Sequence, residues 1–478
     1  MPKTYLFYDI EATGLNKSFD QVVQFAAIRT DLDLNPIEEI EFFVTLSPDV
    51  VPSPYASMTH HIPIKTCQEK GLSEYEAICR IHQLLNTPDT VSLGYNTLTF
   101  DDEFLRFSFY QHLLAPYTHQ YANGCSRMDI YPMTVLYYLF KPEVLDVWPT
   151  KNGTPSMKLE LINKANSLAK GAAHDALVDV KATLALAKKF KQVPDMWQYL
   201  IDYFDKKTDQ ARIDKLPKKD GLTVGLLALP LLGSRYRYLA PVLLLGTHKK
   251  YNNQQLLLRL DLSELAQSTP NNFTDTTWVI RKKLGENGFI LPMSERFMAP
   301  IDAKRLALVE SNLAFLKAQP ELLELICAHY TNWVFPTIEK ADISSTLYQQ
   351  GFWNQQEKRQ CAAFHDTPDN EKPALLTKWS EHEPLYELAL RVTGRLAYSA
   401  LSDPQKTRFD TYLEQALFSE EPLIDYTGKE KFTTDKALHE INIIEKKGLT
   451  SEQQTVITEL QAYLEEKMLA HNQLISGK

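Results

Sequence analysis

Two acidic side chains stand two residues apart near the N-terminus. An apolar, strand-like run over residues 4–10 contains Asp9 and leads into Glu11. Because side chains alternate across a strand, Asp9 and Glu11 project from the same face, and Gly14 permits a turn after them. Paired carboxylates on an interior strand are costly unless they bind a partner such as a metal ion. The plainer alternative is an acidic pair on a solvated strand end.

A second acidic group follows another apolar, strand-like run at residues 90–95. Asp101 stands where a turn gives way to a predicted helix, and a helix-capping role would explain it without any chemistry. Asp102 and Glu103 suit the first turn of that helix, where the helix dipole favours acidic side chains.

His174 and Asp179 form the third element. On one continuous helix they would be separated by about 140° and could not share a face. We therefore expect His174 on the loop or first turn before the helix predicted at residues 175–191. From there it can reach a site that Asp179 enters from within the helix.

These residues together suit metal-assisted phosphodiester hydrolysis. Asp9, Glu11, Asp101 and Asp179 supply four carboxylates, and His174 supplies a base that titrates near neutral pH. Oxygen ligands select hard cations, which favours two Mg²⁺ ions, with Mn²⁺ as a substitute. Two such ions about 3.5–4 Å apart can hold a phosphodiester, activate a water and stabilise the leaving oxygen. His174 would accept the proton of that water.

The elements that must position these residues lie in the first of three predicted regions. The chain has 478 residues, enough for several domains, and 44% of them are hydrophobic, as in ordinary folded proteins. Residues 1–195 alternate strands and helices, which predicts an α/β domain with a mixed sheet. Its predicted strands are 4–10, 22–30 and 38–46, which suggest a meander, and 90–95; its predicted helices are 73–85, one from 101, and 175–191.

The other two predicted regions differ in pattern from the first. After Pro194 and the Lys- and Asp-rich segment 206–220, residues 200–345 predict a β-rich domain, with a helical appendage at 303–330. Residues 346–478 are predicted to be helical throughout. The predicted strands of the middle domain are 222–229, 237–245, 256–260 and 277–282, and the C-terminal helical segments include 384–401, 405–418 and 451–474.

Charge and cysteine content narrow the functional classes. The net charge is −9, yet residues 205–259 hold eleven Lys and Arg against four Asp, which is a local basic island. The five scattered cysteines argue against a disulfide framework or a zinc site. No apolar stretch is long enough to span a membrane, and the first residues lack the apolar core of a signal peptide. We expect a cytoplasmic protein.

Three motifs resemble those of the DEDDh 3′→5′ exonucleases, in the same order. They are residues 9–14 (Asp-Ile-Glu-Ala-Thr-Gly), Asn96-x-x-x-Phe100-Asp101, and His174-x-x-x-x-Asp179. Residues 24–31, 94–96, 100–103 and 164–166 are further similar to bacterial exonuclease I. This resemblance implies a ribonuclease H-like exonuclease domain, an SH3-like β-rich domain and a C-terminal helical domain, arranged as a C-shaped clamp on single-stranded DNA.

The resemblance also implies roles for individual residues. Asp9, Glu11, Asp101 and Asp179 would hold the metals, His174 would be the general base, and Glu11 and Thr13 would approach the terminal 3′-hydroxyl. Lys158 stands where the family commonly has Arg, and Val135 replaces another basic contact. The remaining positions that match family contacts to DNA are Arg106, Tyr117, Tyr121, Lys141, Lys158, Tyr199 and Lys206, and the basic island would line the clamp.

By resemblance, the protein would release 5′-mononucleotides from the 3′ end of single-stranded DNA, in DNA repair or recombination. A single-stranded-DNA-binding protein is the implied partner, and a threading clamp works as a monomer. Two alternatives stay open. Related enzymes with the same five catalytic residues process RNA ends, and a nuclease fold without activity would serve as a nucleic-acid-binding scaffold.

Overall fold

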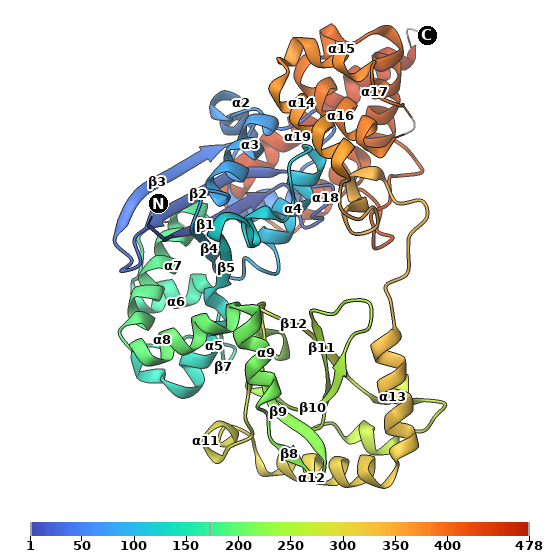
Figure 1. Cartoon of the computed structure of the whole chain (residues 1–478). Helices are drawn as coiled ribbons and strands as arrows, with labels where there is room; N and C mark the ends of the chain where they lie inside the picture. Colours follow the sequence, from blue (N-terminus) through green and yellow to red (C-terminus); the bar gives the residue numbers. More distant parts are fainter. Residues whose placement is uncertain (1, 172–173, 382, 477–478) are drawn as a thin grey trace.

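The computed structural model describes residues 2–171, 174–381 and 383–476. The N-terminal region and the C-terminal helices pack together in the upper part of Figure 1, and the sheet-rich middle region lies below them. The segment that follows α13 (Pro320–Asn332) runs alone from the middle region back to the C-terminal helices. None of the described helices is both long and apolar enough to cross a bilayer.

The N-terminal region is built on a mixed sheet of five strands in the order β3-β2-β1-β4-β5. Neighbours among the first three strands are antiparallel, which confirms the predicted meander, whereas β4 and β5 run parallel to β1. The strand that carries Asp9 and Glu11 is therefore central, as predicted. The strands are β1 (Thr4–Ala12), β2 (Val22–Thr30), β3 (Pro36–Phe43), β4 (Thr90–Gly94) and β5 (Ser126–Asp129).

Helices cover both faces of this sheet. Tyr5 and Phe7 of β1 share a core with α5 and α7, while Leu6 and Ile10 share one with α3 and α4. The sequence predicted α3, α4 and α7, but not the other helices. The helices of the N-terminal region are α1 (Pro54–His60), α2 (Ile64–Lys70), α3 (Glu74–Leu85), α4 (Asp101–Gln111), α5 (Ile130–Phe140), α6 (Leu159–Asn166), α7 (Ala176–Lys191) and α8 (Pro194–Ile201), and a small hairpin joins β6 (Thr150–Lys151) to β7 (Thr154–Pro155).

The middle region contains an antiparallel sheet in the order β12-β11-β10-β9-β13, with β8 paired to β9. The predicted strands are present, but the predicted boundary segment 206–220 contains a helix, α9, capped by the Asp205 side chain. The elements are α9 (Lys206–Asp214), β8 (Lys218–Lys219), β9 (Leu222–Ala228), β10 (Leu239–Thr247), β11 (Gln254–Arg259), α10 (Phe273–Thr276), β12 (Val279–Lys283), β13 (Phe289–Leu291), α11 (Glu295–Met298), α12 (Ala303–Ala318) and α13.

The C-terminal helices share their apolar cores with the N-terminal region. Phe107 of α4 packs in one core with Leu385, and Val51 packs in another with Ile457 and Leu460. The prediction of continuous helix after residue 346 is wrong at residues 419–433, where the chain forms a turn with a bridge between Ile424 and Glu430. The helices are α14 (Gln355–Asp366), α15 (Lys372–Leu376), α16 (Pro384–Ala397), α17 (Asp403–Leu417), α18 (Thr434–Glu445) and α19 (Ser451–Ser476).

Candidate active site

Asp9 and Glu11 lie at the C-terminal end of β1 and are both partly buried. By strand alternation they share a face with Tyr5 and Phe7, the two residues that contact the α5 and α7 core. The face that carries the two carboxylates is therefore the one covered by α7.

Asp179 enters the site from the first turn of α7. This helix begins at Ala176 because the Asp175 carboxylate accepts hydrogen bonds from the backbone N–H groups of Leu177 and Val178, at 3.0 and 3.3 Å. His174 precedes the cap and has a left-handed backbone, with φ of 61°. It lies outside the helix, as its spacing from Asp179 predicted.

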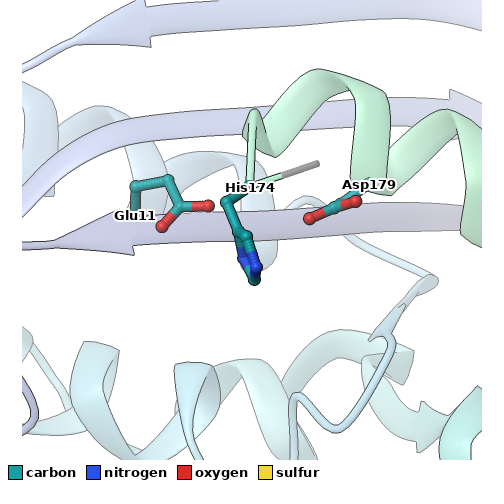
Figure 2. Close-up of side chains that lie close together, drawn as sticks. All are labelled: Glu11, His174 and Asp179. Carbon is teal, nitrogen blue, oxygen red and sulfur yellow. The ribbon is translucent and has the colours of Figure 1, made fainter. Parts of the chain in front are cut away.

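Glu11, His174 and Asp179 come together at this point. One potential ligand atom from each of the three side chains lies within 4.8 Å of the other two. Figure 2 shows Glu11 on its strand and Asp179 on its helix, with His174 between them on the turn that leads into the helix. Strand, turn and helix thus contribute one potential ligand each.

Asp101 is the first residue of α4, and its carboxylate does not cap the helix. It accepts a hydrogen bond from the backbone N–H of Ile10 at 3.2 Å, which places it against the end of β1 between Asp9 and Glu11. The capping alternative is therefore wrong for Asp101. The dipole explanation is also insufficient for Asp102, which is fully buried and contacts Arg127, Arg106 and His119.

A tight turn carries the chain from β4 to Asp101. A Cβ on Gly94 would lie 2.4 Å from the carbonyl oxygen of Tyr8, so only glycine lets β4 end this close to β1. Asn96 then adopts a left-handed backbone with φ of 69°. The buried Asp129 accepts hydrogen bonds from the backbone N–H groups of Asn96 and Leu98, at 2.8 and 3.2 Å, and so holds the turn.

The carboxylates of the site repel one another. Burial and the neighbouring acids raise the pKa values of Asp9 and Glu11 well above their ordinary range. Burial raises the pKa of Asp101 to about 7 and that of Asp179 to about 6, although the nearby His174 lowers the latter. Four acids that resist ionising together form a donor set that fits divalent cations, because bound positive charge would relieve the repulsion.

The turn after Glu11 is held by its own side chains. Thr13 is buried, and its hydroxyl donates to the Asp20 carboxylate at 3.1 Å and accepts from the backbone N–H of Gln21 at 2.9 Å. A Cβ on Gly14 would lie 2.4 Å from the same Asp20 carboxylate. The predicted turn after Glu11 is present, and Gly14 permits the close approach of Asp20 within it.

Glu160 is a site residue that the sequence did not reveal. Its carboxylate lies 3.3 Å from Nε2 of His174, and it belongs to the first turn of α6. An acid next to the histidine can fix the orientation of its ring. No spacing rule links residues 160 and 174, and only the packing of α6 against α7 brings them together.

The side chains predicted to contact DNA differ in their exposure to solvent. Arg106 is buried against Asp102 and lies under the ring of Tyr117, at 5.9 Å from the ring centroid. Tyr121 is exposed, and Lys141 and Lys158 have partly or largely exposed side chains, with loose ion pairs to Glu143 and Glu160. Val135, where the family has a basic residue, is fully buried in α5.

Tyr199 and Lys206 lie where the chain enters the middle region. Tyr199 is 38% exposed, and the Arg212 guanidinium lies 4.2 Å from its ring centroid. Lys206 is exposed at the start of α9. Most of the basic island is also exposed, but Arg259 is fully buried and paired with Asp261, so it cannot line a clamp as predicted.

Two exposed apolar side chains near these residues were not predicted as contacts. Leu15, in the turn after Glu11, is 84% exposed, and Phe352 is 83% exposed and packs edge-on against Tyr117. The exposure of a single apolar residue cannot be inferred from sequence, because it depends on which segments fold over it.

Comparison with known proteins agrees with this geometry. The exonuclease family model matches residues 6–187, the region that contains the acidic residues and His174. Exonuclease I from Methylocaldum szegediense superposes with a TM-score of 0.84 at 26% identity, over 97% of this chain and 99% of that one. Fold and site thus define a nuclease, an exonuclease of the ribonuclease H-like class with a sheet-rich and a helical extension.

The chain belongs to the exodeoxyribonuclease I family. The Haemophilus influenzae exodeoxyribonuclease I is 30% identical over 445 residues, which cover 87% of this chain and 90% of that protein. The Escherichia coli enzyme is 30% identical over 392 residues, covering 78% and 81%. The structure of E. coli exonuclease I in complex with a dA16 oligonucleotide superposes with a TM-score of 0.84 at 25% identity, over 97% of this chain and all of that one. The family and fold predicted from the sequence are confirmed.

Proposed function

We propose that this enzyme degrades single-stranded DNA from its 3′ end and releases 5′-mononucleotides. The observation that carries the proposal is the convergence of Glu11, His174 and Asp179, with Asp101 against the same strand end, in a chain of the exodeoxyribonuclease I family. E. coli exonuclease I has been crystallised with oligonucleotides of deoxyadenosine and deoxythymidine, which supports a single-stranded DNA substrate here.

The proposed cofactor is a pair of Mg²⁺ ions, for which Mn²⁺ would substitute. Asp9, Glu11, Asp101 and Asp179 would hold them, because hard oxygen donors suit these cations. E. coli exonuclease I has also been crystallised with zinc, which is in keeping with a metal site in the family. Bound divalent cations would supply positive charge that polarises the scissile phosphate and makes an attacking water more acidic.

The protein groups have separate proposed roles. His174 accepts the proton of the attacking water, and Glu160 orients the imidazole ring from α6. Glu11 approaches the terminal 3′-hydroxyl. Thr13 would approach the same hydroxyl from the turn that its own side chain holds, by donating to Asp20 and accepting from the backbone N–H of Gln21.

The proposed DNA path combines stacking with charge. Tyr117, Tyr121 and Tyr199 offer aromatic faces, on which each stacked base gains about 1–3 kcal/mol regardless of sequence. Lys141, Lys158 and Lys206 are the proposed phosphate contacts. Arg106 lies buried under the ring of Tyr117 and would support this ring where a base stacks on it.

We propose domain limits of 1–195 for the exonuclease domain, 200–345 for the SH3-like β-rich domain and 346–478 for the helical domain, which together clamp the DNA. The exposed lysines of α9 and of the β10–β11 turn support a basic lining contributed by the middle domain. The enzyme would act as a monomer in DNA repair or recombination, with a single-stranded-DNA-binding protein as partner. Because bacterial DNA lies in the cytoplasm, we place it there.

The proposal is tested by incubating 3′-labelled single-stranded DNA, duplex DNA and RNA of one sequence with the protein, in Mg²⁺ or in chelator. We expect rapid, Mg²⁺-dependent release of mononucleotides from the single-stranded DNA. Preference for RNA would reassign the substrate, whereas binding without hydrolysis would favour the scaffold alternative. Asp9→Asn should abolish hydrolysis and retain DNA binding, and a fully active variant would contradict the site assignment.

A further inference from the structure

The turn between β12 and β13 of the middle region reaches into the exonuclease domain. Its near side is fixed to its own region, because the buried Asp209 carboxylate accepts from the Lys282 ammonium at 2.6 Å and from the backbone N–H of Gly285 at 2.9 Å. Glu286 and Asn287 follow Gly285 and point the other way, toward the turn that carries Asp101.

Glu286 contacts that turn through Arg127. The Arg127 guanidinium donates to the Glu286 carboxylate at 3.0 Å with one nitrogen and to the Asp102 carboxylate at 2.5 Å with the other. Asp102 is fully buried and directly follows Asp101 in the first turn of α4. Nε2 of His119 lies within hydrogen-bond distance of the other carboxylate oxygen of Asp102, at 2.8 Å. Arg106 also contacts Asp102, with its Nε 3.2 Å from the carboxylate. Three side chains thus fix the position of Asp102, and one of them, Arg127, is itself held by the middle region.

Asn287 contacts the other end of the same turn. Its side-chain amide donates to Asp129 at 3.4 Å, and Asp129 accepts from the backbone N–H groups of Asn96 and Leu98. Burial raises the pKa of Asp129 to about 6, against the lowering effect of these hydrogen bonds. Each hydrogen-bond donor to Asp129 therefore favours its ionised form, which is the form that holds the turn.

These polar contacts are not needed to attach the middle region. Leu226, Leu239 and Phe289 already share an apolar core with Phe7 and Val135 of the exonuclease domain. Apolar contacts hold two surfaces together without fixing an angle, whereas an arginine between two carboxylates is directional. The polar contacts are therefore suited to setting the orientation of the turn.

We propose that Glu286 and Asn287 are positioning residues for the catalytic centre: through Arg127 and Asp102 at one end and Asp129 at the other, they orient the turn that presents Asp101. The inference rests on the proposed function, since it concerns the metal affinity of that site. It makes the middle region part of the catalytic apparatus as well as a surface for DNA.

The test compares Glu286→Ala, Asn287→Ala and Glu286→Gln with the full-length wild type. Mn²⁺ binding is measured by calorimetry in the absence of DNA, and kcat and KM on single-stranded DNA are measured over a Mg²⁺ titration. Groups that orient metal ligands typically contribute about 10-fold or more to metal affinity. We expect both alanine variants to bind Mn²⁺ about 10-fold more weakly and to lose kcat at limiting Mg²⁺, with KM for DNA within about 2-fold of the wild type.

Glu286→Gln keeps an acceptor oxygen for Arg127 and should recover most of the affinity lost in Glu286→Ala. The matched control is Glu264→Gln, an exposed glutamate of the same region whose side chain accepts a hydrogen bond from the neighbouring Ser263. Unchanged Mn²⁺ affinity in the alanine variants, with or without a lower melting temperature, would overturn the inference. A wild type that binds Mn²⁺ but leaves DNA intact would instead refute the proposed function, while the order of Mn²⁺ affinities would still test the positioning role.

Discussion

Asp101 and Asp102 are neighbours in sequence, yet their carboxylates have opposite effects on stability. Burial raises the pKa of Asp101 to about 7. In Asp102 burial acts in the same direction, but Arg127, Arg106 and His119 outweigh it and hold the pKa well below its ordinary value. The ionised carboxylate of Asp101 therefore opposes folding, whereas that of Asp102 stabilises the fold.

This contrast predicts opposite responses to substitution in metal-free protein. The folded state holds the Asp101 proton to a higher pH than the unfolded chain, so this group makes the protein less stable as pH rises from about 4 to 7. Asp101→Asn should raise the free energy of unfolding at pH 8 by about 1–4 kcal/mol, and the gain should shrink as pH falls toward 4. This gain in the free energy of unfolding is measured by urea unfolding in the presence of chelator at several pH values.

For Asp102→Asn we expect a change in the free energy of unfolding of the opposite sign. Since the folded-state pKa of Asp102 is depressed, its contribution is present at neutral pH and is lost only as pH falls below the ordinary carboxyl pKa. This variant should unfold more easily at pH 8. Equal shifts of the same sign in both variants would contradict the assigned electrostatics.

Lys158, a residue of the proposed DNA path, shares a partner with His174, since both pair with Glu160. If it contacts a phosphate, Lys158→Ala should raise KM for single-stranded DNA and reduce the salt dependence of binding by about one ion, with kcat nearly unchanged. Lys151→Ala, an exposed lysine in β6, is the control. The measurement is KM for single-stranded DNA at several salt concentrations. If neither KM nor its dependence on salt changes in Lys158→Ala, Lys158 is not part of the DNA path.

Among the elements, those with strong local patterns could be predicted from the sequence. The strand at β2, the helix at α7 and the position of His174 outside that helix followed from apolar periodicity and angular spacing. The short helices α1, α2 and α6 have too few turns to produce a clear periodicity. The helix α9 was hidden by its polar composition, since it is rich in lysine and aspartate.

The residues of the candidate site could be predicted from the sequence, whereas the residues that hold them in place could not. The three motifs carry the potential metal ligands within a few residues of strand and helix ends, where sequence signals are strongest. Glu160, Arg127, Glu286 and Asp129 act across long separations, and their partners are decided by how helices and sheets pack. Local patterns in the sequence do not record such contacts.

At the scale of elements, the end of β4 predicts a test of the turn before Asp101. Gly94→Ala would place a Cβ 2.3 Å from a Thr97 methyl and 2.4 Å from the Tyr8 carbonyl oxygen. We expect a lower melting temperature and a large loss of kcat. Gly94→Ala combined with Thr97→Ser removes only the methyl contact, so recovery of activity in this double variant would show that the backbone contact is unimportant.

The C-terminal helices share apolar cores with the N-terminal region, so we expect the two to unfold as one cooperative unit. Leu460 of α19 is fully buried with Val51 and Ile64 of the N-terminal region. Leu460→Ala should therefore cost about 2–5 kcal/mol and lower the single unfolding transition that includes the nuclease. Leu469→Ala, on the same helix but 62% exposed, is the matched control.

Calorimetry shows whether α19 unfolds together with the nuclease or independently of it. A separate, low-temperature transition that leaves nuclease activity intact in Leu460→Ala would mean that the C-terminal helices unfold independently. A shared transition would mean that the exonuclease domain depends on residues more than 200 positions away in sequence.

The shared cores also bear on when the enzyme becomes active during its own synthesis. In the turn after Glu11, the side-chain amide of Asn16 donates to the Asp425 carboxylate, and the Phe19 carbonyl accepts from the Lys431 ammonium. The helices α1 and α2 also pack on α19. Ribosomes add roughly 5–20 residues each second, so the first 200 residues wait roughly 15–50 s for these partners to emerge. A nascent nuclease would thus remain incomplete on the ribosome, and its capacity to destroy DNA would arise only after the last helix has been made.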